Sequence, residues 1–280
     1  MKSEQLTILV GGGGKTGRRV ASRLAARGMP FRSASRSSAL PFDWEQEQTW
    51  APALHGATSL YLTYYPDLAV PGASEQIRRL SRLAVECGVR HIVLLAGRGE
   101  PQVWASERAV RESGASFTIL RCAWFNQNFS ESLLLEPVLE GNVAFPAGDV
   151  REPFLDVEDV ADVAVAALTD PRHMGQIYDL TGPRLLSFAE AVLEIARASQ
   201  RDVRYTPISN AAYAEALAAQ LPPEQVSLLS ELFTMLLDGH NALLTDGVER
   251  ALGRNPRDFA DYARDAALSG AWHTGKTAPA

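Results

Sequence analysis

The chain has 280 residues, of which 46% are hydrophobic and 21% charged, and a net charge of −6 at pH 7. These values are typical of a globular protein with a full hydrophobic core. An acidic chain lacks the basic face that nucleic-acid binding needs, and no apolar run approaches the roughly 20 residues of a membrane span. Because the start of the sequence leads straight into a predicted strand, we expect no signal peptide. Cys87 and Cys122 form neither a disulfide framework nor a metal site. We therefore expect a cytoplasmic protein that binds no metal, nucleic acid or membrane.

An apolar strand at residues 6–10 runs directly into a glycine-rich turn. Gly11, Gly14 and Gly17 give the spacing G-x-x-G-x-x-G before a helix expected over 15–27. The apolar face of this helix is expected at Val20, Leu24 and Ala25. A glycine turn between a strand and a helix N-terminus lets backbone amides hold a pyrophosphate. The pattern therefore predicts a dinucleotide site.

Two further residues of the turn, Lys15 and Thr16, are also expected to contact the cofactor. They would fit the end of a nucleotide-triphosphate P-loop, but that motif needs a glycine at position 9, where Leu9 stands. The P-loop interpretation is thus excluded by spacing. The cofactor-binding residues predicted in this turn are Gly11, Gly14, Lys15, Thr16 and Gly17.

The end of a second strand, expected over 31–35, indicates which dinucleotide binds. An NAD-selective site places Asp or Glu at this point to bind the ribose hydroxyls. This chain has Arg36 and Ser37 instead, with serines on either side. A guanidinium suits a 2′-phosphate, which a carboxylate would repel. We predict NADPH/NADP as the cofactor; the alternative is that Arg36 is a solvated loop residue.

The first half of the chain alternates strands and helices, which is typical of a parallel sheet covered on both faces. Further strands are expected at 41–44, 59–63, 91–95 and 116–121, and helices at 71–87 and 101–113. Glu107 and Arg108 on the last of these helices are expected to form a solvated face. The predicted fold class is α/β, a Rossmann doubly wound parallel sheet.

The second half is less regular and richer in helices. A helix is expected at 158–168, a strand at 176–180, a helix at 187–199, and helical pieces between 210 and 267. The apolar stripe of a helix at 222–237 is either core, or a lid or homodimer face. We expect one domain over 1–273, with a small, mostly helical substrate lobe formed mainly by 126–152 and 182–270. Residues 274–280 are expected to be a disordered tail.

Three longer segments, together with the glycine turn and the arginine after the second strand, carry a resemblance to a known family. They are RCAWFNQNF (121–129), PFLDVEDVAD (153–162) and YDLTGP (178–183). With these the chain resembles the NmrA-like branch of the atypical short-chain dehydrogenases/reductases over almost its whole length. Segments 34–38, 42–44 and 124–130 are most similar to ergot-alkaloid reductases of the festuclavine and agroclavine type. The chain is also similar to type-2 quinone oxidoreductases, triphenylmethane-dye reductases and redox-sensing NADP-binding regulators.

The catalytic pair of typical short-chain dehydrogenases is missing. Those enzymes protonate a carbonyl oxygen with a Tyr that precedes a Lys by four residues, positions that would fall near Gly99 and Val103. No Tyr-x-x-x-Lys occurs between Leu95 and Phe117. For a simple ketone, loss of this acid should cost ~10²–10⁴ in rate. An iminium acceptor becomes a neutral amine, and a quinone or cationic dye gives a weakly basic product, so neither depends on that acid.

The resemblance implies which loops surround the nicotinamide. Tyr64, Tyr65 and Asn128 are the catalytic candidates, and Tyr64, Ala96 and Gly97 are expected beside the cofactor. The predicted substrate-contacting residues are Trp104, Trp124, Phe125, Asn128, Phe233 and His240. An aromatic ring offers a stacking face to a flat or cationic acceptor. The alternative for each aromatic is a packing role, and for His240 an exposed turn.

We therefore predict an NAD(P)H-dependent oxidoreductase, specifically an NADPH-dependent imine or quinone reductase with a small, flat or cationic substrate. One alternative is a non-catalytic NADP(H)-sensing regulator that binds a protein partner. Another is a carbonyl reductase with a substitute proton donor, such as Tyr64, Tyr65 or His240. The identity of the substrate does not follow from the sequence.

Overall fold

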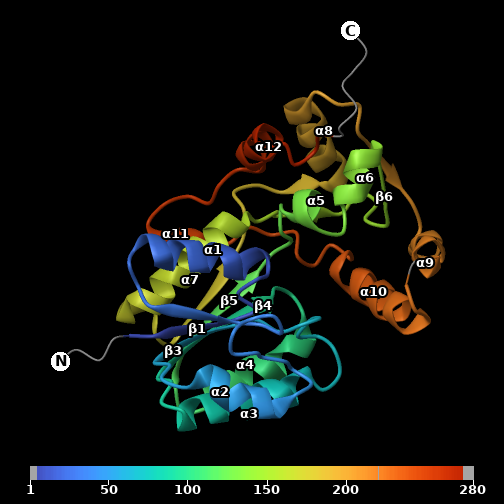
Figure 1. Cartoon of the computed structure of the whole chain (residues 1–280). Coiled ribbons are helices and arrows are strands. Elements are labelled where there is room, and N and C mark those ends of the chain that lie inside the picture. Colours follow the sequence, from blue (N-terminus) through green and yellow to red (C-terminus); the bar gives the residue numbers. More distant parts are fainter. Residues whose placement is uncertain (1–4, 220, 274–280) are drawn as a thin grey trace. The chain divides into compact units, whose positions relative to one another are not determined.

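A computed structural model describes residues 5–219 and 221–273 of the chain, which divide into two compact units (Figure 1). Unit 1 comprises the described residues of Met1–Cys122, Val157–Leu180 and Asp246–Arg254. Unit 2 comprises those of Ala123–Asp156, Thr181–Thr245 and Asn255–Ala280. The chain therefore passes between the units several times, and each unit has its own hydrophobic core.

Unit 1 is built on a six-stranded sheet in the order β2-β1-β3-β4-β5-β8. The strands are β1 (Thr7–Val10), β2 (Phe31–Ala34), β3 (Ser59–Leu62), β4 (His91–Gly97), β5 (Ser116–Cys122) and β8 (Gln176–Leu180). Every neighbouring pair is parallel. The strand order reverses beside β1, so the loops after β1 and β3 face the crevice where such sheets bind ligands. The predicted Rossmann fold is confirmed.

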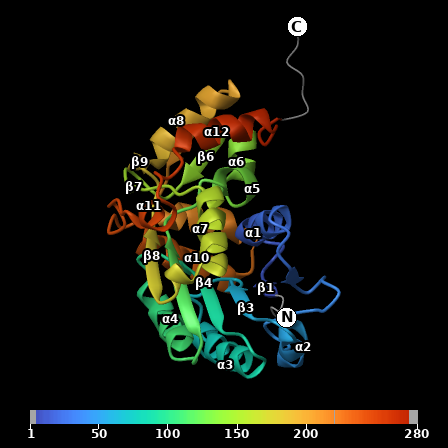
Figure 2. The same cartoon turned by 90° about the vertical axis from the view of Figure 1, so that its left-hand side faces the viewer.

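Helices cover both faces of this sheet, as Figures 1 and 2 show. On one face lie α1 (Lys15–Ala26) and α7 (Val157–Thr169), which pack against each other. On the other lie α2 (Trp50–Leu54), α3 (Ala73–Glu86) and α4 (Trp104–Arg111). The short α11 (Gly247–Leu252) packs against α7 and β8, and 3-10 turns occur at Glu47–Thr49, Pro101–Val103 and Pro171–His173.

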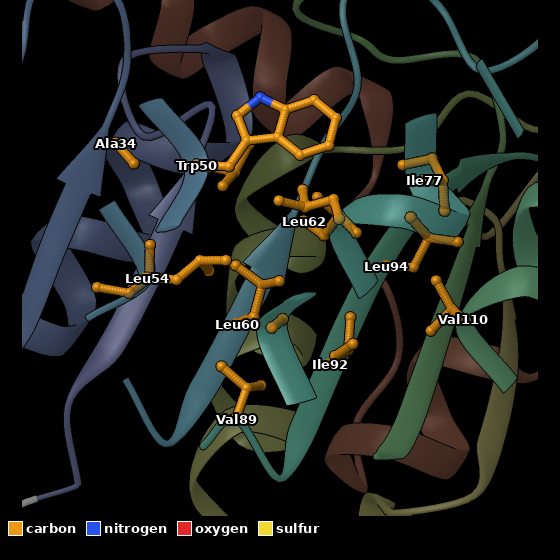
Figure 3. Packing of buried hydrophobic residues seen from close by; sticks show 14 of the residues in the cluster. Ala34, Trp50, Leu54, Leu60, Leu62, Ile77, Val89, Ile92, Leu94 and Val110 are labelled. Atoms are coloured by element: carbon orange, nitrogen blue, oxygen red, sulfur yellow. The ribbon is translucent and has the colours of Figure 1, made fainter. Parts of the chain in front are cut away.

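The core between the sheet and the α2–α4 layer follows from the alternation of side chains along a strand. Leu60 and Leu62 of β3, and the corresponding Ile92 and Leu94 of β4, point to this layer and are fully buried (Figure 3). They meet Trp50, Leu54, Ile77 and Val110 from the helices. This packed core sets the positions at which β3 and β4 end and their loops begin.

Two details of unit 1 differ from expectation. Residues 41–44 form an irregular loop rather than a strand, because aromatic packing takes the place of backbone pairing there. Phe42 stacks on Trp50 with ring centres 6.1 Å apart, and the Trp50 indole N–H donates to the Asp43 carbonyl at 2.8 Å. On α1, Val20 and Leu24 are buried as predicted, but Ala25 is exposed.

Unit 2 combines short helices with two small sheets that sequence analysis did not predict. The helices are α5 (Asn128–Glu131), α6 (Leu135–Glu140), α8 (Phe188–Ser199), α9 (Asn210–Ala218), α10 (Pro223–Leu236) and α12 (Phe259–Leu268). Strands β6 (Asn142–Phe145) and β10 (Arg204–Pro207) pair in parallel, and β7 (Arg151–Glu152) pairs antiparallel with β9 (Leu186–Ser187). Its core is aromatic, with Phe129, Phe145, Phe154, Phe188, Phe259 and Trp272 all buried.

The segments expected to form a substrate lobe, 126–152 and 182–270, lie in unit 2 except for 246–254, which pack in unit 1. That they bind substrate stays a prediction. The tail predicted at 274–280 lies outside the described residues. Within the described ranges, no helix is both long and apolar enough to cross a membrane.

Candidate functional site

The glycine turn after β1 is held in a shape that requires glycine at both ends. Gly11 has a φ of +81°, and a Cβ there would lie 2.0 Å from Oγ1 of Thr63, the residue after β3. At Gly17, in the first turn of α1, a Cβ would lie 2.2 Å from the carbonyl oxygen of Gly11. The backbone of α1 at Gly17 therefore lies in direct contact with the backbone of the turn at Gly11, and only glycine permits so close an approach.

The N-terminus of α1 suits a pyrophosphate group. Gly14 is its N-cap and provides no side-chain hydrogen bond to the first turn, and no acidic residue occupies that turn. A Cβ at Gly13 would meet nothing within 4 Å, so the turn is open on that side. An uncapped, unobstructed helix N-terminus attracts an anion through its amides and dipole. The turn and helix thus fit the predicted dinucleotide.

The loop after β2 presents the positive group expected there. Arg36 and Ser37 are exposed, and the Arg36 guanidinium lies 6.0 Å from the ring centre of Tyr65, which follows β3. Ser38 braces the loop, since its hydroxyl accepts from the Ser35 amide at 2.9 Å and donates to the Leu40 carbonyl at 2.8 Å. Arg36 and Tyr65 are therefore brought together on adjacent loops, with no carboxylate between residues 35 and 38.

The two tyrosines after β3 have different environments. Tyr65 is 71% exposed. Tyr64 packs on Trp44, with ring centres 4.6 Å apart, and its hydroxyl donates to Oε1 of Gln76 at 2.5 Å. Burial raises the pKa of the Tyr64 hydroxyl. Its hydrogen bond anchors the Tyr64 ring in the core next to the loop, whereas Tyr65 is free to contact a ligand.

The end of β4 carries a buried acid that sequence analysis missed. Ala96 is buried, and Gly97 is half-buried at the strand's last position. The carboxyl group of Glu100 folds back over Gly97, where a Cβ would lie 1.9 Å from Glu100 Oε1. Trp104, predicted as a substrate contact, is 56% exposed at the start of α4. The burial of Glu100 could not be predicted from the sequence, because a glutamate between a glycine and a proline is typical of an exposed turn.

Glu107 corrects another expectation, because it is buried rather than solvated. Its two carboxylate oxygens accept from Nε and Nη2 of Arg121 at 2.8 and 2.7 Å. Arg108, its neighbour on α4, is exposed as expected. The pair joins α4 to β5, and the hydrogen bonds that Arg121 donates to Glu107 raise the pKa of Arg121. Sequence spacing missed it because Glu107 and Arg121 are brought together only by the sheet.

Within unit 2, two of the predicted substrate residues lie in one aromatic cluster. The Trp124 ring lies 5.9 Å from that of Phe233 on α10, and it also contacts Phe145 and Phe188. Trp124 is half-buried, and among the described residues its buried indole N–H has no hydrogen-bond partner. Phe233 is 4% exposed, so the stripe of α10 contributes at least this residue to the core.

The remaining candidates of unit 2 are half-buried or exposed. Phe125 precedes α5, which begins at Asn128, and both are half-buried. His240 is exposed in a turn, and its ring contacts the Asp238 carboxylate. Asn126 is fully buried, and within the described part of the chain its side-chain amide has no hydrogen-bond partner. The roles of these residues toward a substrate stay predictions.

Comparison with known proteins adds relatives that span the whole chain. No family model matches. The NAD(P)H azoreductase of Xenophilus azovorans is 29% identical over 282 residues, covering 92% of this chain and 97% of the relative. The agroclavine dehydrogenase of Claviceps fusiformis is 27% identical over 277 residues, covering 92% and 96%. Both relatives are oxidoreductases by name, and both align from end to end.

Solved structures share the fold. Triphenylmethane reductase from Citrobacter sp. superposes with a TM-score of 0.74 at 19% identity, covering 94% of this chain and 99% of that one. The negative transcriptional regulator Nmra, solved with NAD, superposes with a TM-score of 0.71 at 17% identity, covering 95% and 96%. The predicted resemblance to NmrA-like atypical short-chain dehydrogenases/reductases is confirmed by these relatives and neighbours. The predictions of an oxidoreductase and of a nicotinamide cofactor are thereby confirmed.

Proposed function

We propose that this protein, which resembles atypical short-chain dehydrogenases/reductases, is an NADPH-dependent reductase that transfers hydride to a small conjugated acceptor, of imine, iminium or quinone type. One observation carries the proposal. The segment after β4, which would supply a tyrosine–lysine pair in typical members, forms a turn and a 3-10 turn without either residue in the expected spacing. A reductase without this tyrosine suits acceptors whose reduction does not require proton donation from a tyrosine hydroxyl.

The choice of NADPH is supported by the loop after β2. Arg36 stands exposed where an NAD-selective protein carries a carboxylate, and a guanidinium can bind a 2′-phosphate through two parallel hydrogen bonds. Ser37 is exposed beside it and can add a hydroxyl donor. Gly11, Gly14 and Gly17, with the N-terminus of α1, would hold the pyrophosphate. When bound, the reduced nicotinamide supplies the hydride.

The acceptor class is supported by the relatives and by the aromatic side chains. Relatives and neighbours are named as azoreductase, agroclavine dehydrogenase, triphenylmethane reductase and NADPH-dependent quinone oxidoreductase. Tyr65, which is exposed, presents ring surface that can stack on a flat or cationic molecule. The protein would bind and orient the acceptor, and positioning alone contributes several kcal/mol to such a reaction.

The first experiment measures NADPH and NADH consumption by the purified protein against cyclic iminium salts, quinones, triphenylmethane dyes and simple ketones. We expect turnover with members of the first three classes and a preference for NADPH. Turnover of ketones alone would overturn the acceptor assignment. NADPH binding without turnover of any acceptor would overturn the proposed reductase in favour of a cofactor-sensing role.

Two variants test the residue assignments. Arg36→Asp should weaken NADPH binding at least ~10-fold more than NADH binding, because the new carboxylate repels the 2′-phosphate. Arg27→Asp makes the same charge change at the exposed far end of α1 and is the matched control. Equal losses for both cofactors would refute the role of Arg36. If the triple variant Tyr64→Phe, Tyr65→Phe and Asn128→Ala keeps wild-type turnover, those residues are not the catalytic group.

A further inference from the structure

A buried carboxyl group, that of Glu100, lies just after β4 and has no role in the function proposed so far. Glu100 is 7% exposed although it sits in a loop, and its Oε2 atom is buried without a hydrogen-bond partner among the described residues. Its carboxyl group occupies the space that a side chain at Gly97 would take, with Cδ 2.3 Å from the position of a Cβ there. A buried carboxyl group with an unpartnered oxygen is costly to keep, so its retention calls for a role.

The surroundings of Glu100 favour its neutral form. Burial, and then the nearby charge of Asp67, raise the pKa of the Glu100 carboxyl to about 8. Asp67 follows β3, accepts a hydrogen bond from the Ala69 amide at 2.8 Å, and has its own pKa raised by burial. The charged residues on the loops after β3 and β4 are Asp67, Arg98 and Glu100. At neutral pH Glu100 therefore still holds a proton that it can give up.

The topology places this acid at the cofactor edge of the sheet. β1, β3 and β4 are consecutive parallel neighbours, so the glycine turn after β1 and the loops after β3 and β4 leave the same edge. Gly97, against which the carboxyl group lies, is the last residue of β4. In sheets of this type, cofactor and substrate bind beyond the carboxyl ends of the strands.

We propose that Glu100 is the proton donor of this reductase toward acceptors whose reduced nitrogen or oxygen must be protonated, an inference that rests on the reductase function proposed above. The reduced nicotinamide, when bound, would supply hydride to one end of a C=N or C=O bond, and the electron pair of that bond would move to the nitrogen or oxygen. That atom takes the proton of the Glu100 carboxyl as the carboxyl O–H bond breaks. The Glu100 carboxylate regains a proton from water before the next turnover.

The proposal separates two kinds of acceptor. A neutral imine needs a proton on the nitrogen that receives the electron pair, because the anion is otherwise strongly basic, whereas an iminium ion becomes a neutral amine without one. General acid catalysis by a positioned side chain contributes ~10²–10⁴-fold. The ratio of neutral-imine turnover to iminium turnover should therefore depend on Glu100, while a purely structural role would lower both rates together.

The test compares Glu100→Gln with the wild-type protein on a neutral imine and on a cyclic iminium salt, with NADPH as reductant. Glu100→Gln keeps the shape of the side chain but has no acidic proton, and Glu112→Gln, exposed at the end of α4, is the matched control. We expect the ratio of neutral-imine to iminium turnover to fall at least ~100-fold in Glu100→Gln and to stay constant in Glu112→Gln. The wild-type rate with the neutral imine should also decline as pH rises through about 8, with no such decline in Glu100→Gln.

A second readout does not depend on turnover or on the stability of the variant. Infrared spectra of the wild-type protein should show a protonated-carboxyl band at pH 7 that disappears on titration above pH 8. Three results would each overturn the proton donor while leaving the reductase intact. They are absence of that band, an unchanged imine-to-iminium ratio in Glu100→Gln, and wild-type reduction of iminium salts but of no neutral imine. A wild-type protein that reduces no acceptor would instead overturn the reductase itself, and the proton donor with it.

Discussion

Replacing Gly17 with Ala should destabilise the protein even though alanine is the better helix former. A Cβ at this position would lie 2.2 Å from the Gly11 carbonyl oxygen and 2.8 Å from Gly12 Cα, both backbone atoms that no rotamer change can move. The turn would have to open by about 1 Å. Overpacking of this kind costs about 1–3 kcal/mol and occasionally more, against a gain of up to about 1 kcal/mol in helix propensity. We expect a net loss of about 1–2 kcal/mol in the free energy of unfolding.

The measurement is urea denaturation of Gly17→Ala beside Gly13→Ala and the wild-type protein. Gly13 is the matched control because it lies in the same turn, has no positive φ, and a Cβ there would meet nothing within 4 Å. Gly13→Ala should change the unfolding free energy by less than about 0.5 kcal/mol. Gly17→Ala should also weaken NADPH binding, since it would move the turn that we propose to hold the pyrophosphate. Equal stability losses in the two variants would refute the steric reasoning.

Three further predictions concern stability. Glu107→Ala should lower the free energy of unfolding by about 2 kcal/mol in urea denaturation. The reason is that the partly buried guanidinium of Arg121 would lose the carboxylate that it contacts at 2.7 and 2.8 Å. A loss below about 0.5 kcal/mol would instead show that water replaces the Glu107 carboxylate. Burial lowers the pKa of His91 to about 4, so the unfolded chain gains a proton below pH 6.5 that the folded chain excludes. Stability should therefore fall as pH drops from about 6.5 to 4, and His91→Gln should flatten that part of the profile. Ser187→Ala should cost about 1 kcal/mol in thermal denaturation, because the Ser187 hydroxyl accepts from the Glu190 amide in the capping box of α8; an unchanged melting temperature would contradict this.

The local signals in the sequence were sufficient to predict the strand, turn and helix of the proposed cofactor site. The apolar run at 6–10, the glycine spacing and the amphipathic helix after it act over neighbouring residues, so they predicted β1, the turn and α1 correctly. Arg36 was predicted at the end of β2 for the same reason, and the structure places it in an exposed loop there. Strand-and-helix alternation predicted the Rossmann sheet, because parallel strands need helical crossovers.

What only the tertiary structure decided concerns residues whose partners are far away in the chain. Residues 41–44 were predicted to form a strand, yet Phe42 and Trp44 pack on Trp50 and the segment pairs with no other strand of the described sheet. Glu100 is an ordinary loop residue in sequence, and its burial and raised pKa follow from the packing of the loops after β3 and β4. Sequence periodicity reports which face of an element is apolar. It does not report which distant polar groups that packing encloses, and those enclosed groups are where the chemistry of this protein is to be sought.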